Sequence, residues 1–226
     1  MLNSPEKIST PNVSIAIETD PESHGWREGS RLEAGVFQEK GYIEDERELE
    51  IEYEKYMPRT EFVSVEVNGR IQGSARFIYF SDLIGFKTLD DIISGRLKVT
   101  KEGHELLTGI DLSRTFEVGT LAAAPQARSI PEDEGRVAVA LYGAIYGETQ
   151  RHDCEHILAS FDEEYFLKFK GIFGAGAKEL GPSTDYMGSP TVPVVMEAYT
   201  LLDHIHKVFP LMYNAVVEHA AALSHA

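Results

Sequence analysis

The dipeptide Asn68-Gly69 is the feature that most constrains the fold of this chain. Asn-Gly is the strongest two-residue signal for a β-hairpin, because both residues tolerate the positive φ angles of a type I′ turn. Apolar alternation typical of strands covers 61–67 before the turn and 71–80 after it. The rest of the chain alternates between strand and helix patterns. A hairpin inside such a chain predicts an α/β (α+β) fold with a mixed, twisted sheet flanked by helices, rather than a doubly wound parallel sheet.

Runs of apolar and β-branched residues predict four further strands, and helical periodicity predicts the helices between them. The remaining predicted strands cover 13–19, 115–122, 156–161 and 192–198, and the helices cover 22–40, 89–93, 131–151, 162–170 and 201–223, the last interrupted near Pro210. The acidic stretch 44–55 fits either a short helix or a solvated face. The glycine-rich stretch 171–181 reads as a flexible loop. With residues 1–12 as a polar lead-in and 200–226 as a C-terminal helix, we expect 1–226 to form one domain.

Charge and cysteine content exclude several classes of function. Acidic residues outnumber basic ones 37 to 21, which gives a net charge of −16. Such a surface repels phosphate backbones and anionic lipid, so no nucleic-acid partner is expected. No apolar run approaches the ~20 residues of a membrane span, and the start lacks the features of a signal peptide. With Cys154 as its single cysteine, the chain forms no internal disulfide, and we expect a cytoplasmic protein.

Several local patterns occur in an order that resembles the GNAT acyltransferase superfamily. Within that superfamily the likeness is to the autoinducer synthases and the N-acyl amino acid synthases. It spans roughly residues 13–199, and its strength lies in the order of the motifs. The patterns are Arg31 to Phe37 with Gly41-Tyr42, Glu54-Lys-Tyr56, Asn68 to Phe77 with Gly73 and Arg76, Phe116-Glu117-Val118, and Tyr165 to Phe173 with Gly171.

The chain also departs from those synthases at defined positions. The glycine-rich pyrophosphate loop is missing, since no glycine occurs between Gln126 and Gly135. Thr120 stands where autoinducer synthases have an arginine, and Glu33 stands where their first helix has one. Their paired aspartates correspond to Glu54 and Met57. The departures argue against homoserine lactone production and favour N-acylation of another amine.

The resemblance implies an N-acyltransferase without a tightly bound cofactor. Its acyl thioester, on coenzyme A or on an acyl carrier protein, would react with the amine of an amino-acid-like small molecule. Such an amine must lose a proton, the thioester oxygen needs donors as it becomes an oxyanion, and the leaving thiolate needs a proton. Two alternatives stay open: an acetyl-coenzyme A N-acetyltransferase acting on a small molecule, and a GNAT-shaped binding protein without activity.

Four residues are candidates for this chemistry. Glu117 is the predicted base, acting directly or through water; the alternative is an ordinary ion pair with Arg76 or Arg114. Arg76 is a candidate for holding a substrate carboxylate, and is equally consistent with a structural role. Glu54 is the candidate that receives the acceptor's ammonium group. Tyr165 is the candidate proton donor to the thiolate.

The resemblance also places the acyl donor. Its pantetheine would lie against the splayed strand at Val118 and Gly119, and its phosphates near the start of the following helix. Arg128 and Ser129 occupy that start, but Glu132, Asp133 and Glu134 follow them and oppose phosphate binding. An acidic carrier protein would need a basic patch. The candidates for the patch are Lys168, Lys170, Lys178 and Arg151, of which Lys168 and Lys170 are also assigned to the donor site.

Two further expectations concern a cleft and a metal. A deep, partly apolar cleft is predicted beside 115–122, with Glu117 on one wall and the start of the 131–151 helix nearby. Phe77, Tyr79, Phe80, Leu141 and Ile145 are candidates for lining an acyl tunnel, and equally for plain core. The segment 152–156 contains histidine, cysteine and acidic residues, but its passage from helix to strand turns them in different directions. No metal is expected there, and nothing marks Cys154 as a nucleophile.

Overall fold

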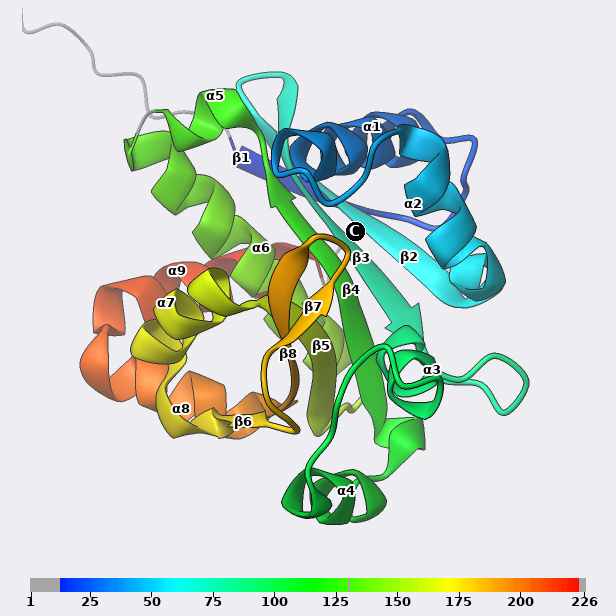
Figure 1. Cartoon of the computed structure of the whole chain (residues 1–226). Helices are drawn as coiled ribbons and strands as arrows, with labels where there is room; N and C mark the ends of the chain where they lie inside the picture. Colours follow the sequence, from blue (N-terminus) through cyan, green and yellow to red (C-terminus); the bar gives the residue numbers. More distant parts are fainter. Residues whose placement is uncertain (1–12, 130, 224–226) are drawn as a thin grey trace, which may run out of the picture.

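Eight strands form one mixed sheet in the computed structural model, which describes residues 13–129 and 131–223, without the side chains of 131–134. The order across the sheet is β1-β2-β3-β4-β5-β8-β6, and β7 pairs with β8 (Figure 1). Among the described strands, β4 and β5 are the parallel pair and the other pairs are antiparallel. The strands are β1 (Val13–Glu18), β2 (Thr60–Val67), β3 (Arg70–Tyr79), β4 (Thr115–Ala123), β5 (His156–Asp162), β6 (Ala177–Glu179), β7 (Thr184–Tyr186) and β8 (Ser189–Glu197). The mixed sheet and all six predicted strands are confirmed.

The predicted hairpin joins β2 and β3. Asn68 and Gly69 have φ angles of 53° and 79°, and Val67 pairs directly with Arg70 across the turn. These positive angles are those a two-residue type I′ turn requires. The local chemistry of two residues therefore fixes the pairing next to the turn, while a bulge between Val65 and Glu66 shifts the register beyond it.

Helices cover both faces of the sheet. They are α1 (His24–Glu39), α2 (Glu46–Tyr53), α3 (Lys87–Ile93), α4 (Lys101–Thr108), α5 (Pro125–Arg128), α6 (Pro131–Arg151), α7 (Glu163–Phe173), α8 (Ala198–Val208) and α9 (Pro210–Leu223), with short 3₁₀ turns at Glu54–Arg59, Leu112–Arg114 and Gly174–Gly176. The acidic stretch is a helix, α2, because the Asp45 side chain caps it by accepting a hydrogen bond from the Glu48 N–H at 3.1 Å. The predicted break near Pro210 separates α8 from α9. None of the helices described is both long and apolar enough to cross a membrane.

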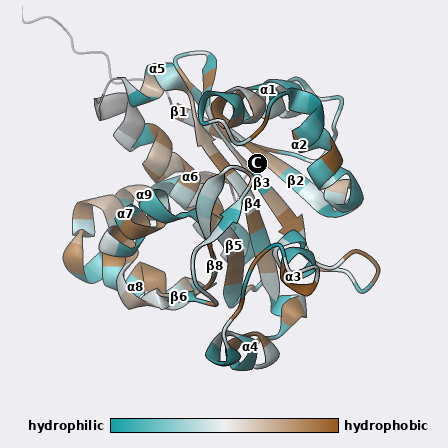
Figure 2. Ribbon diagram, in the orientation of Figure 1, coloured by the Kyte–Doolittle hydropathy of each residue, from teal (hydrophilic) through white to brown (hydrophobic). Residues whose placement is uncertain are grey.

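Each face of the sheet has its own hydrophobic core. α1, α2 and α3 lie on one face, here called face A, where Tyr53, Ile78 and Leu158 are buried. On the other, face B, α6 to α9 pack over Phe77, Phe116 and their neighbours. Figure 2 shows the apolar residues concentrated along the strands between these layers. The side chains of β4 alternate between the two cores, so this strand connects them.

The prediction of a flexible loop over 171–181 is wrong. α7 continues past Gly171 and ends at Gly174, whose φ of 69° terminates the helix, and β6 follows. Gly181 lies against the Lys98 carbonyl so closely that a Cβ atom would be 1.9 Å from its oxygen. Gly103 on α4, a helix the sequence did not predict, meets the Leu180 carbonyl in the same way. Both glycines serve close packing rather than flexibility.

Candidate active site

The site begins where β4 and β5 separate. Their parallel pairing runs from Thr115 opposite His156 to Val118 opposite Ala159, while both strands continue beyond it. Gly119 follows as a β-bulge, because Arg76 pairs with Thr120 and the next residue of β3 with Val118. Diverging strands leave backbone groups of β4 open to a ligand that adds as an extended chain. This opening is the place at which Val118 and Gly119 were predicted to meet the acyl donor.

Tyr53 holds the bulge in place. Its hydroxyl donates to the Gly119 carbonyl at 2.7 Å, and its ring lies against Gly119, where an added Cβ would be 3.1 Å away. Burial raises the pKa of Tyr53 well above its usual range, so this hydroxyl keeps its proton. This contact was not predicted, because Tyr53 is on α2, 66 residues before Gly119 in the chain.

Glu117 lies on face A of β4, next to this opening, and is 2% exposed. Its carboxylate accepts hydrogen bonds from the Thr88 backbone N–H at 3.0 and 3.2 Å and from the Thr88 hydroxyl at 2.8 Å. Burial raises the pKa of Glu117 to about 7, against the opposing effects of the Thr88 hydrogen bonds and of Lys87. A carboxyl group with a pKa near neutrality is suited to general base catalysis.

The alternative of an ion pair between Glu117 and an arginine is wrong. Arg76 instead forms a bidentate ion pair with Glu33 of α1, at 2.8 and 3.2 Å, and both side chains are buried. Its guanidinium also lies 4.4 Å from the centre of the Tyr53 ring. Arg114 pairs with Asp153 and Glu155, at 2.9 and 2.5 Å. The geometry of Arg76 favours its structural role over binding of a substrate carboxylate.

A charged cluster lies beside Glu117 on the same face. Lys87, 4% exposed, contacts Asp91 at 2.8 Å and Glu52 at 3.0 Å. Arg96 contacts the same two carboxylates, at 3.0 and 2.8 Å, and the Tyr186 hydroxyl donates to Asp91 at 2.6 Å. Two cations and two anions thus balance one another. The i, i+4 spacing of Lys87 and Asp91 was a usable sequence signal for part of this cluster.

Glu54, the predicted partner of the acceptor ammonium, lies outside this cluster. It is exposed, on the 3₁₀ turn that follows α2. The helical twist turns Glu52 toward Lys87 instead. The carboxylates paired with Lys87 are therefore Glu52 and Asp91, neither of which was among the predicted site residues.

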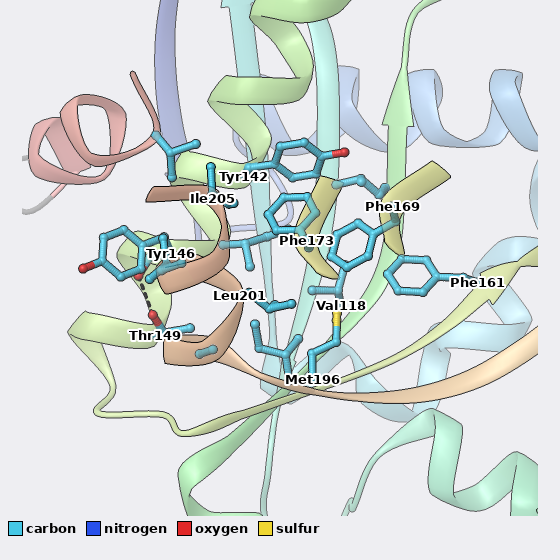
Figure 3. Close-up of a pocket in the computed structure, with 16 residues that line it drawn as sticks. Val118, Tyr142, Tyr146, Thr149, Phe161, Phe169, Phe173, Met196, Leu201 and Ile205 are labelled. Atoms are coloured by element: carbon cyan, nitrogen blue, oxygen red, sulfur yellow. Dashed lines mark hydrogen bonds between the residues drawn. The ribbon is translucent and has the colours of Figure 1, made fainter. Parts of the chain in front are cut away.

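An apolar cavity of about 40 Å³ lies on face B, beneath the opening. Figure 3 shows side chains of β4, α6, α7 and α8 converging on it. The expectation that Glu117 forms a wall of the cavity beside β4 is wrong, because β4 contributes Val118 and Leu121 and Glu117 points to the opposite face. The lining is Val118, Leu121, Tyr142, Ile145, Tyr146, Thr149, Ile157, Phe161, Phe169, Phe173, Met196, Ala198, Leu201, Leu202, Ile205 and Val216.

Of the five residues predicted to line a tunnel, Ile145 lines this cavity. Phe77, Tyr79 and Leu141 belong to the face B core, and Phe80 packs against the face A core. Phe77, Tyr79 and Phe80 are separated from the cavity because β3 lies on the far side of β4 from β5. Leu141, on α6, packs instead against β3 at Gly73.

Tyr165 is on α7, at the edge of this cavity. Its hydroxyl is 3.1 Å from the hydroxyl of Tyr142, which lines the cavity. Burial raises the pKa of Tyr165 well above its usual range. The phenol therefore holds its proton at neutral pH, as a proton donor must.

The residues predicted to bind the donor's phosphates have partners within the protein. The Arg128 guanidinium donates to the Ala123 carbonyl at 3.1 Å and pairs with Glu39, and the Ser129 hydroxyl donates to the Gln126 carbonyl at 2.7 Å. A short helix, α5, replaces the family's glycine-rich loop. The side chains of Glu132, Asp133 and Glu134 lie outside the described part of the structure.

The four candidates for a basic patch are each paired with a carboxylate. Lys168 contacts Glu164 at 2.7 Å, Lys170 contacts Glu179 at 3.0 Å, Lys178 contacts Glu197 at 2.5 Å, and Arg151 contacts Glu148 at 2.7 Å. Such pairing cancels much of the field that would attract an acidic carrier protein.

The segment 152–156 separates its potential ligands. His152 gathers with Glu61 and Glu148, whose ligand atoms and its own lie within 4.8 Å of one another. Arg151 already bridges the two carboxylates, so a cation is present in this group. Cys154 is buried, and desolvation raises its pKa to about 11. It is therefore a thiol at neutral pH and a poor nucleophile.

The mixed sheet with its splayed β4 and β5 has the GNAT fold. Structurally similar proteins include FeeM, an N-acyl amino acid synthase from uncultured soil microbes, with a TM-score of 0.61 at 15% identity over 86% of this chain and 96% of that one. The CoA-dependent acyl-homoserine lactone synthase BjaI has a TM-score of 0.55 at 12% identity, over 94% and 100% of the two chains. The AHL synthase LasI has 0.54 at 14%, over 84% and 91%. No protein-family profile matches the chain. No curated protein matches it either.

Proposed function

We propose that this protein is an N-acyltransferase that moves an acyl group from an acyl thioester to the amine of an amino-acid-like small molecule. The observation that carries the proposal is the buried Glu117, with a pKa of about 7, beside the opening between β4 and β5. The structural likeness to an N-acyl amino acid synthase supports the choice of acceptor.

Coenzyme A is the better candidate for the donor's carrier. The chain has a net charge of −16, and the four candidates for a basic patch are paired with carboxylates. A similar structure, BjaI, contains isopentyl-CoA. An acidic carrier protein would meet repulsion at this surface.

The proposed reaction uses Glu117 as the base that takes one proton from the acceptor ammonium. The free amine then attacks the thioester carbonyl, and the C–N bond forms as the C–S bond breaks. Backbone N–H groups of β4 beyond Val118 are the candidates for stabilising the oxyanion. Tyr165 is the candidate that supplies a proton to the thiolate. The nitrogen then loses its second proton, which reprotonates Tyr165.

The acyl group would enter the apolar cavity. At about 40 Å³ the cavity must widen by side-chain movement to take a chain as long as octanoyl. Each methylene that becomes buried contributes about 0.8 kcal/mol, so an octanoyl or palmitoyl donor is expected to react at least tenfold more efficiently than an acetyl donor. The measurement is release of free coenzyme A thiol from acetyl-, octanoyl- and palmitoyl-coenzyme A with each of the twenty amino acids. If acetyl-coenzyme A is the best donor, the enzyme is an acetyltransferase. Ligand-dependent thermal stabilisation without thiol release would indicate an inactive binding protein.

A substitution in the cavity tests whether the acyl group binds there. Ile145→Trp fills part of the space, and is expected to lower kcat/KM for octanoyl-coenzyme A about tenfold while changing the value for acetyl-coenzyme A far less. Leu167→Trp adds the same side chain at an exposed position of α7 and serves as the control. Equal losses with both donors in Ile145→Trp would show that the cavity is ordinary core.

The pH dependence of turnover should follow Glu117. A base must be deprotonated to act, and burial raises the pKa of Glu117 to about 7. Turnover is therefore expected to rise with pH through about 7 and then level off, because the carboxylate form accumulates above that pH. Initial rates between pH 5 and 9 test this expectation. A rate that is already nearly level from pH 5 upward, as the ordinary glutamate pKa of about 4.3 would give, would contradict it.

A further inference from the structure

Glu117 is closed off from any substrate that stays in the opening. It is 2% exposed, and Thr88, whose backbone and side chain both donate to its carboxylate, is 1% exposed. Neither the apolar cavity nor the groove between α1 and the hairpin tip includes Glu117 in its lining. An acceptor amine therefore needs an intermediate group to deliver its proton.

Ser160 supplies a polar atom at the opening. It is on β5, one residue beyond Ala159, the last position that pairs with β4. Its alternation with Leu158 places it on face A, and it is partly exposed. The Ser160 hydroxyl is 3.0 Å from the Thr88 hydroxyl, which is 2.8 Å from Glu117. The three side chains form a continuous path from the opening to the buried carboxylate.

We propose that the hydroxyl groups of Ser160 and Thr88 relay a proton from the acceptor ammonium to Glu117. This inference rests on the proposed function. Thr88 has one hydroxyl hydrogen, which it donates to Glu117, so it must accept from Ser160 in the resting chain. The lone pairs of Ser160 that remain are then free to accept a hydrogen bond from an ammonium group in the opening.

The relay conserves protons at each step. The ammonium gives a proton to the Ser160 oxygen, Ser160 passes its own to Thr88, and Thr88 passes its own to Glu117. The net change is a neutral amine and a protonated carboxyl group, with both hydroxyls intact and turned toward the opening. Thr88 and Ser160 return to their first orientation when Glu117 releases the proton by the same path.

Two pairs of variants test the relay with octanoyl-coenzyme A and the amino acid that reacts best. Ser160→Ala and Thr88→Val remove one hydroxyl each and are expected to lower kcat about tenfold or more. Ser160→Thr and Thr88→Ser keep the hydroxyl and are expected to restore kcat to within threefold or so. Val at position 88 retains the backbone N–H that donates to Glu117 and is close in shape to threonine.

The pH dependence of turnover is expected to differ between the variants at positions 88 and 160. Lys87, Asp91, Tyr53 and Tyr56 also face Glu117 and are unchanged in these variants. Thr88→Val is expected to move the rise in turnover to higher pH, because the lost hydroxyl donor stabilised the carboxylate. Ser160→Ala is expected to leave the rise near pH 7 while lowering its plateau, because Ser160 does not contact Glu117.

Solvent isotope effects provide a readout of the protons in flight. In mixtures of H₂O and D₂O, the plateau rate of the wild type is expected to change nonlinearly with the deuterium fraction. The plateau rate of Ser160→Ala is expected to change linearly and less steeply. Ser160→Ala with wild-type kcat, or Ser160→Thr as impaired as Ser160→Ala, would overturn the relay and leave the proposed function standing. No thiol release by the wild type with any donor and amino acid would overturn both.

Discussion

Replacing Glu117 by glutamine is expected to lower kcat for octanoyl-coenzyme A about a hundredfold or more. A general base contributes roughly 10²–10⁴ to the rate, and an amide cannot take the proton. The amide oxygen of glutamine can still accept the Thr88 hydrogen bonds, so the site should keep its shape. The rise of turnover with pH near 7 should disappear with the carboxyl group. Steady-state rates between pH 5 and 9 give both quantities.

Glu50→Gln is the matched control, since Glu50 is exposed on α2 and the chemical change is identical. It should leave kcat unchanged. Urea unfolding of both variants shows whether either has lost stability. Wild-type turnover in a folded Glu117→Gln protein would remove Glu117 from the mechanism and leave it a structural carboxyl group that anchors Thr88.

Glu33→Ala is expected to reduce the free energy of unfolding by about 3–5 kcal/mol. Glu33 is fully buried and Arg76 is 4% exposed, so the variant leaves a guanidinium in the core without its partner. The rings of Tyr53 and Phe62, 4.4 and 4.9 Å from that guanidinium, offset only part of this cost. Equilibrium unfolding in urea measures the loss.

The double variant Glu33→Leu, Arg76→Met distinguishes a structural role of Arg76 from a role in binding the substrate. Apolar side chains of similar volume in place of a buried ion pair are often neutral or stabilising, so this protein should recover most of the lost stability. If Arg76 is structural, acyl transfer should also recover. A stable double variant with a strongly raised KM for the acceptor would show instead that Arg76 holds a substrate carboxylate. Stability of Glu33→Ala within 1 kcal/mol or so of the wild type would contradict the buried pair.

The Glu33–Arg76 pair gives a physical reason for one departure from the autoinducer synthases. Those proteins have an arginine at the first-helix position that is Glu33 here, whereas Arg76 matches their hairpin arginine. In this chain the two positions are in contact and carry opposite charges. The charges at the two positions thus balance each other between α1 and β3.

The candidate base was predictable from the sequence, but its surroundings were not. Phe116-Glu117-Val118 stood out because it followed the hairpin and helix motifs in the order of the synthases. Thr88 lies in a region with weak periodicity, 29 residues from Glu117, and Ser160 is 72 residues from Thr88. Hydrogen bonds across such separations leave no local pattern, because they depend on how α3 and β5 approach the sheet.

The sequence by itself predicted six of the eight described strands, and missed the two short strands β6 and β7. The Asn68-Gly69 turn needs positive φ angles, and the apolar alternation on both sides of it has a period of two, so the hairpin and its pairing next to the turn follow from local chemistry. The bulge between Val65 and Glu66, which shifts the register farther along, was not predicted. Only the tertiary structure decided what the polar side chains do. Packing of α3 over β4 removed water from Glu117, which raised its pKa, and packing of α1 turned Arg76 toward Glu33. The burial of Glu117 and the Glu33–Arg76 pair depend on groups distant in the chain, and no local pattern encodes them.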